Sequence, residues 1–176
     1  MKWDTNSDVL LYPVRNIPNT QIVTKREILQ HTSRIYDPLG LLSPVTIRAT
    51  LLLQELWQQK FEWDMSLPDS IQEKWRSLIT DLNSVTKTTL PRYYFENTLN
   101  ASSNTCIHIF CDASLVSYGA TACICRNNQS SLLMAKIRVA PLKKLTLPRL
   151  ELMAAVIGSR LSKHLQHNTS IAQIYL

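Results

Sequence analysis

Two carboxylates stand in a basic background in the second half of the chain. Residues 101–176 contain eight Lys or Arg but only two acidic residues, Asp112 and Glu151. Asp112 ends an apolar stretch with the pattern of a buried strand, where an ionised carboxylate is costly unless it has a cation or hydrogen-bond donors. Carboxylate oxygens bind hard cations such as Mg²⁺, and basic flanks hold a phosphate backbone. Together these residue types indicate metal-assisted cleavage of a phosphodiester.

A purely structural interpretation of both acids stays open on position alone. Glu151 falls in the first turn of a predicted helix, where the helix dipole favours a negative charge. Asp112 can cap the turn that follows its strand. The metal hypothesis requires a helix packed across the sheet, which would bring the two side chains together.

The net charge of the chain, +6, is confined to the same half. Residues 1–100 contain 11 basic and 11 acidic residues, so the whole excess lies in residues 101–176. Such an asymmetry predicts a surface that binds a polyanion, although a domain can also be basic without binding one. Lys143, Lys144 and Arg149 precede Glu151 and are the expected contacts to a nucleic-acid backbone.

Hydrophobic periodicity predicts the elements that must position the two acids. Residues 105–176 are predicted to form strand, strand, strand, helix and strand, at Cys106–Asp112, Ser117–Cys125, Leu132–Val139, Thr146–Asn168 and Ile171–Leu176. The first strand is apolar on both faces and should be central in a sheet. The helix has an apolar stripe made of Leu150, Met153, Ala154, Ile157, Leu161 and Leu165. We expect it to cover the face that Asp112 shares and to leave Ile107, Ile109 and Cys111 partly exposed.

Residues 1–104 are predicted to be mainly helical. Residues 1–23 form a loop-rich lead-in with a strand candidate at Val9–Tyr12. Three helices follow, from the capping box at Thr24 to about Tyr36, from Ser43 to about Lys60, and from Ser70 onward. The third helix has one apolar face, and Trp57, Trp63 and Trp75 are assigned to the core and not to a base-stacking platform. Residues 86–104 form a linker with one short extended piece.

Spacing excludes several other kinds of site. The sequence has no Gly-rich phosphate loop and no Gly-x-Ser-x-Gly motif. The cysteines lack the two-residue spacing of structural zinc sites and alternate along strands as small apolar residues do. His108 is assigned to the core, and His164 and His167 to a helix C-terminus that favours cations. No apolar run reaches membrane-spanning length and no secretory signal opens the chain, which predicts an intracellular protein.

Two blocks of sequence resemble a known family. Ile109–Ser114 (IFCDAS), followed by Tyr118-Gly119-Ala120, resembles the first strand and hairpin of an RNase H domain. Lys143–Leu152 (KKLTLPRLEL) resembles the start of its first helix, which carries the second acid of that family. Upstream, several segments resemble the region that joins reverse transcriptase to RNase H in the Pol polyprotein of BEL/Pao-type LTR retrotransposons, also catalogued as a Pao retrotransposon peptidase family. These segments are Thr24-Lys25-Arg26, Ile35–Val45, Trp63-Asp64 and Leu67-Pro68.

The resemblance implies an α+β or α/β fold, in which a helical connection region precedes an incomplete RNase H-like β-β-β-α-β unit. It implies that residues 1–23 are the tail of the reverse transcriptase palm. Residues 24–104 would be the connection region with its linker, and residues 105–176 the N-terminal half of the RNase H domain. Asp112 matches the first metal-binding acid of the family and Glu151 the second. The third and fourth acids have no counterpart in this sequence.

The function implied by the resemblance is binding of an RNA/DNA hybrid and cleavage of its RNA strand by two-metal hydrolysis with Mg²⁺ or Mn²⁺. The partners would be the hybrid and the rest of the Pol polyprotein, in the cytoplasm, a virus-like particle or the nucleus. Two acids provide few ligands for two ions, so we expect this chain alone to be inactive. The alternative is a non-catalytic nucleic-acid-binding or assembly remnant of a decayed or domesticated element. Peptidase chemistry is not expected, because the sequence has no Asp-Thr-Gly or Asp-Ser-Gly loop.

Overall fold

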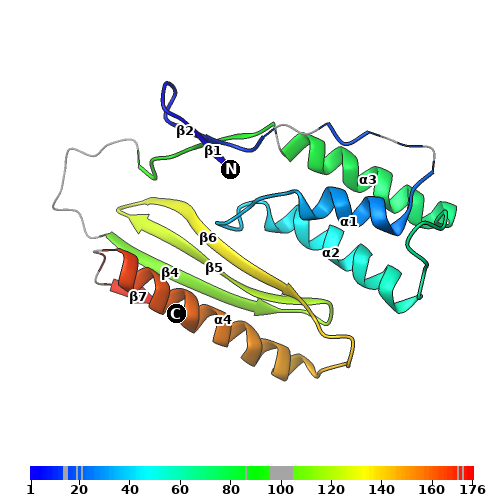
Figure 1. Ribbon diagram of the computed structural model, residues 1–176. Helices are drawn as coiled ribbons and strands as arrows, with labels where there is room; N and C mark the ends of the chain where they lie inside the picture. Colours follow the sequence, from blue (N-terminus) through cyan, green and yellow to red (C-terminus); the bar gives the residue numbers. More distant parts are fainter. Residues whose placement is uncertain are drawn as a thin grey trace. The chain divides into compact units, whose positions relative to one another are not determined.

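The computed structural model describes residues 1–13, 16–18, 20, 22–85, 87–95, 105–169, 171 and 173–176. The chain forms two compact units, Met1–Pro38 with Pro44–Arg92, and Leu39–Ser43 with Tyr93–Leu176 (Figure 1). Residues 86 and 96–104 of the predicted linker, and residue 172 of the last predicted strand, lie outside the described residues. Within the described ranges, no helix combines the length and the apolar character needed to cross a membrane.

The first unit combines a small antiparallel sheet with three helices. Its strands are β1 (Lys2–Asp4), β2 (Val9–Leu11) and β3 (Thr89–Pro91), in the order β1-β2-β3. Its helices are α1 (Lys25–Ser33), α2 (Ser43–Gln58) and α3 (Asp69–Val85). The predicted strand near residue 9 and the extended piece of the predicted linker are therefore neighbours in one sheet. Strand β1 has no counterpart among the predicted elements.

The start of α1 confirms half of the predicted capping box. The Thr24 hydroxyl accepts a hydrogen bond from the Glu27 amide at 3.3 Å, as the motif requires. The Glu27 carboxylate accepts a hydrogen bond from the Thr20 hydroxyl at 2.9 Å and so does not turn back to residue 24. The helix ends at Ser33, before the predicted Tyr36, because the Arg34 amide donates to the Thr32 carbonyl and tightens the last turn.

Two tryptophans of the first unit have different environments. Trp75 is 1% exposed and packs with the apolar face of α3, which confirms its assignment to the core. Trp57 is 49% exposed, so its assignment to the core is wrong. Its ring covers the buried ammonium of Lys25, whose Nζ lies 3.6 Å from the ring centroid and donates to the Phe61 carbonyl at 3.1 Å. A buried lysine needs such partners, and the cation–π contact gives the indole a role at the surface.

The second unit contains the predicted elements in the predicted order. β4 (Thr105–Ala113), β5 (Ser117–Arg126) and β6 (Gln129–Val139) are antiparallel neighbours. The helix α4 (Leu147–Asn168) follows, and β7 (Gln173–Tyr175) pairs in parallel with β4. The strand order β6-β5-β4-β7 makes β4 central, which confirms the prediction from its apolar pattern.

Helix α4 runs along one face of this sheet (Figure 1), and it is the face that we expected to stay exposed. Ile107 and Ile109 are buried against the apolar stripe of α4. A Cβ added to Gly158 would overlap the Cys111 Sγ atom, so α4 approaches β4 closely there. Because side chains alternate along a strand, Asp112 belongs to the opposite face, which we call the open face.

The prediction that α4 shares the face of Asp112 is therefore wrong. The reason is the chemistry of the two faces of β4. An apolar helix stripe gains most by covering Ile107 and Ile109. Covering the other face would remove the Asp112 carboxylate from water without a partner. On β4, the large apolar residue that stays exposed is consequently Phe110, which is 61% exposed on the open face.

A short segment of the turn after α1 belongs to the second unit. The Ala135 amide on β6 donates to the Leu39 carbonyl at 2.8 Å, which satisfies one backbone donor of this edge strand. Gly40 has a φ of 70°, in the left-handed region. A Cβ at Gly40 would overlap the Ala135 carbonyl oxygen, so this close approach requires glycine.

Replacing Gly40 by alanine should lower the free energy of unfolding by about 2 kcal/mol or more, because strain at positive φ and overpacking each cost about 1–3 kcal/mol. Urea unfolding of the full chain, followed by circular dichroism, measures the effect. Asparagine tolerates positive φ but carries a Cβ, so Gly40→Asn should also be destabilising. Lys87→Ala, at an exposed site, is the control. Wild-type stability of Gly40→Asn would contradict the contact with β6.

Candidate functional site

Asp112 lies on the open face, near the end of the central strand. It is exposed and stands opposite Gly119 in the β4–β5 register. A Cβ at Gly119 would lie 2.6 Å from the Lys136 carbonyl oxygen, so the close approach of β5 to β6 at this position requires glycine. The hollow at this place has a volume of about 250 Å³, and its lining includes Asp112, Phe110, Ser114, Ser117, Thr121 and Ile137.

The turn after Asp112 is organised by Ser114. Its hydroxyl oxygen accepts from the Ser117 amide at 3.1 Å and from the Val116 amide at 3.3 Å. The Ser114 amide donates to the Ser117 carbonyl at 2.7 Å and closes the hairpin. These bonds fix the register that sets Asp112 opposite Gly119. Neither Ser114 nor Gly119 had a role assigned from the sequence, although a serine directly after a strand is a known turn signal.

Glu151 is exposed on α4, one turn inside the helix. Because α4 begins at Leu147, Glu151 opens the second turn, and the first turn contains no acidic residue. The prediction that Glu151 lies in the first turn is wrong. The helix dipole acts mainly within the first turn, so it accounts poorly for an acid at this position. The interpretation that Glu151 serves only to complement the helix dipole is therefore weaker than the sequence suggested.

The two acids lie at the same end of the second unit but on different elements. The end of β4 and the start of α4 occupy that end of the sheet (Figure 1). The hollow beside Asp112 is lined by β4, β5, β6 and the turn, without a residue of α4. Glu151 is therefore not part of the lining of the hollow that Asp112 lines. Across the described ranges, no three His, Cys, Asp or Glu side chains gather into a metal-binding group.

Both carboxylates are nevertheless available to a cation. Among the residues that the structure describes, neither Asp112 nor Glu151 has a hydrogen-bond or ion-pair partner. Mg²⁺ is commonly held by one or two carboxylates, several waters and the phosphates of a substrate. Exposed, unpaired acids fit that mode of binding, in which the protein supplies few ligands. They do not fit a structural zinc site, which takes four nitrogen or sulfur ligands.

The start of α4 is electropositive. Lys143, Lys144 and Arg149 are all exposed there, and Arg149 lies in the first turn, at the positive end of the helix dipole. The N-cap residue Thr146 is extended, but its side chain makes no capping hydrogen bond. Basic side chains beside uncapped helix amides favour an anion. This arrangement is consistent with the predicted contacts to a phosphate backbone.

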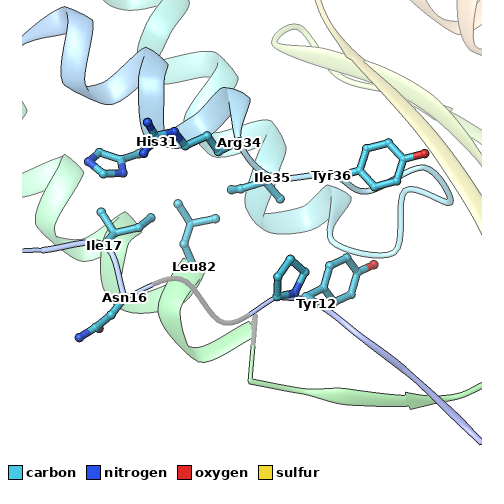
Figure 2. A pocket seen from close by; sticks show the side chains of 9 residues that line it. Tyr12, Asn16, Ile17, His31, Arg34, Ile35, Tyr36 and Leu82 are labelled. Carbon is cyan, nitrogen blue, oxygen red and sulfur yellow. The ribbon is translucent and has the colours of Figure 1, made fainter. Parts of the chain in front are cut away.

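A separate cavity of about 370 Å³ lies in the first unit (Figure 2). Its lining is mainly apolar and aromatic, and burial lowers the pKa of His31 at its wall. The Tyr12 hydroxyl, also at the wall, donates to the Asp37 carboxylate at 2.8 Å. None of the predicted site residues lines this cavity, so it has no part in the chemistry expected of Asp112 and Glu151.

Comparison with known families agrees with this geometry. No curated protein matches the sequence. A family model described as "Pao retrotransposon-like RNaseH-like domain" matches residues 24–176, which is all of the chain except its first 23 residues. The match spans both the helical segment and the sheet that carries Asp112, and it confirms the resemblance seen in the sequence. The chain belongs to the Pao retrotransposon-like RNaseH-like domain family.

Proposed function

We propose that this chain supplies Asp112 and Glu151 to a divalent-metal centre that hydrolyses the RNA strand of an RNA/DNA hybrid. The observation that carries the proposal is the exposed, unpaired carboxylate of Asp112 at the end of the central strand of the sheet. In this proposal residues 1–23 are the tail of a reverse transcriptase palm, residues 24–104 a connection region, and residues 105–176 the RNase H part of a retrotransposon Pol polyprotein.

The residues around Asp112 have distinct roles in the proposed reaction. Bound Mg²⁺ or Mn²⁺ would activate a water molecule and stabilise the charge that develops on the phosphate. Asp112 and Glu151 are the residues that would hold the metal, with water and phosphate oxygens as further ligands. The Ser114 turn holds the end of β4 in register. Gly119, opposite Asp112, lets β5 approach the backbone of β6 closely at this end of the sheet.

The basic start of α4 would hold the nucleic-acid backbone. Lys143, Lys144 and Arg149 contact phosphates in this proposal, and such contacts position a duplex without reading its sequence. Binding should therefore be independent of sequence and strongly dependent on salt.

A second candidate function is a non-catalytic nucleic-acid-binding or assembly module. One observation favours it: within the described ranges, no third acid, His or Cys completes a metal-binding group around either carboxylate. Such a module would keep the basic surface and lack the chemistry. The two candidates differ in whether Asp112 binds a metal and in whether the RNA strand is cut.

Asp112→Asn and Glu151→Gln should each weaken metal binding without unfolding the chain. Mn²⁺ titrations of the full chain, followed by the paramagnetic broadening of amide NMR signals near residues 112 and 151, measure the affinity. Loss of one of two carboxylates should lower it about tenfold or more. Asp69→Asn, at an exposed acid of α3, is the matched control. Unchanged broadening in Asp112→Asn would contradict the assignment of Asp112.

Cleavage is a second test of the same residues. In a Pol polyprotein that contains this chain, either substitution should abolish cutting of a labelled RNA/DNA hybrid and leave hybrid binding nearly intact. The chain alone should not cut, because a two-metal site needs further ligands to hold ions about 3.5–4 Å apart. Wild-type cutting by the Asp112→Asn polyprotein would refute the catalytic role. A polyprotein that binds the hybrid but never cuts it would favour the non-catalytic module.

The double variant Lys143→Ala/Lys144→Ala should flatten the plot of log affinity against log salt by about one to two units, since each phosphate contact releases about one counterion. Fluorescence anisotropy with a labelled hybrid at several salt concentrations measures the slope. The control Lys2→Ala/Lys87→Ala removes the same charge from the first unit. An equal change of slope in both double variants would show that net charge, and not contact with phosphate, is responsible.

A further inference from the structure

The open face carries thiol and imidazole groups that the proposed function does not use. In the β4–β5 register Cys106 stands opposite Cys125, and His108 stands opposite Cys123. We call these four residues the thiol face. They are partly buried and lie on the side away from α4, because the alternate residues of β4 pack against that helix. The cysteines are free thiols.

Cys106 and Cys125 are the thiols best placed for a covalent link. Directly opposed residues of antiparallel strands have Cα atoms about 4.5 or 5.5 Å apart. Both separations lie within the range of about 4.4–6.8 Å that disulfides span. Cys123 and Cys125 are alternate residues of one strand, and their Cα separation of about 6.4–6.8 Å is at the limit of this range. Cys111 belongs to the face toward α4, where burial raises the pKa of its thiol.

Cys106 has a neighbouring base. Its Sγ atom lies 3.4 Å from Nε2 of His108, within hydrogen-bonding range for sulfur. The imidazole stacks on the Tyr175 ring, with centroids 5.0 Å apart and an interplanar angle of 23°. This stacking holds the ring beside the thiol. An adjacent imidazole that takes up the thiol proton stabilises the thiolate, which is the nucleophilic form of cysteine.

We propose that Cys106 and Cys125 form a reversible cross-strand disulfide when the chain meets a peroxide. His108 accepts the proton of Cys106, and the thiolate attacks one oxygen of hydrogen peroxide. The O–O bond breaks, leaving a sulfenic acid on Cys106 and a hydroxide that takes up the proton and departs as water. The Cys125 thiol then attacks the Cys106 sulfur, the S–O bond breaks, and a second water leaves. Two thiols are oxidised and one peroxide is reduced to two waters.

The same residues are less suited to a metal ion. A structural zinc site takes four ligands, and in the described part of the chain no three His, Cys, Asp or Glu form a metal-binding group. A disulfide requires only the opposed pair. It would close the β4–β5 ladder at the end away from Asp112, while the Ser114 turn closes the other end. The bond would therefore make the hairpin that carries Asp112 harder to open.

Mass spectrometry of the oxidised protein tests the proposal. The folded full chain is treated with hydrogen peroxide, alkylated and digested without reduction. The expected product is a peptide pair linked between Cys106 and Cys125, about 2 Da lighter than the two free thiol peptides together. Cys125→Ser should stop at a sulfenic acid on Cys106, which dimedone labels. His108→Gln should slow disulfide formation about tenfold or more, because the neutral thiol is a poor nucleophile.

Two matched variants serve as controls. Cys123→Ser removes the neighbouring thiol of β5, and Cys111→Ser removes a thiol of β4 on the other face; both should form the bond at the wild-type rate. Circular dichroism checks that each variant is folded. A Cys123–Cys125 link in the folded protein would overturn the proposal. So would the absence of any disulfide under conditions that oxidise the urea-unfolded chain. A wild-type rate in His108→Gln would refute the role of the imidazole.

Discussion

The close packing of α4 on β4 is the contact on which the second unit depends. Gly158 lets the helix lie against Ile109 and Cys111, and the apolar stripe of α4 buries Ile107 in the same cluster. Because side chains alternate along a strand, this contact decides the orientation of every residue of β4. The accessibility of Asp112 follows from it. The helix covers isoleucine, which favours burial at about 25 cal/mol per Å² of apolar surface, and leaves the carboxylate in water.

The same packing determines the electrostatics at the end of the sheet. Helix α4 starts beside the end of β4 (Figure 1), and it starts with Arg149 in its first turn and without an acid there. A cation at that place opposes the helix dipole and costs stability, so helix formation alone does not explain the residue. Glu151 follows one turn later, where the dipole is weak. A phosphate beside the start of α4 would offset the unfavourable charge of Arg149 at the positive end of the helix. A metal cation beside Asp112 would offset the unpaired charge of its carboxylate. Nucleic acid and Mg²⁺ together would therefore balance the charges at this end of the sheet.

Local signals explain what could be predicted from the sequence. Periodicity predicted the three long strands and α4, because each has enough residues to show its period, while the three-residue strand β1 was too short. The face that α4 covers was not predictable in this way, since β4 is apolar on both faces and Phe110 resembles a core residue. The exposure of Trp57 was not predictable for a similar reason, because Lys25, whose ammonium contacts the indole ring, is distant in sequence. Composition singled out Asp112 and Glu151, and the family resemblance matched them to metal-binding acids, whereas the close approach of Gly119 to β6 is a contact that only the fold shows.

The ionisable residues of β4 also help to specify its register. Cys106, His108 and Asp112 are separated by even numbers of residues, so they share the open face. A slip of one residue against β5 would turn all of them toward α4 and would expose the isoleucines. Burying the Asp112 carboxylate there without a partner would cost several kcal/mol, and the isoleucines would lose their apolar contacts as well. The slipped register is therefore disfavoured from both faces. Asp112, assigned to metal binding, and Cys106 and His108, assigned to thiol oxidation, thus also favour the native register of β4. The effect of a substitution at Asp112 can be attributed to metal binding only after the register of β4 has been checked.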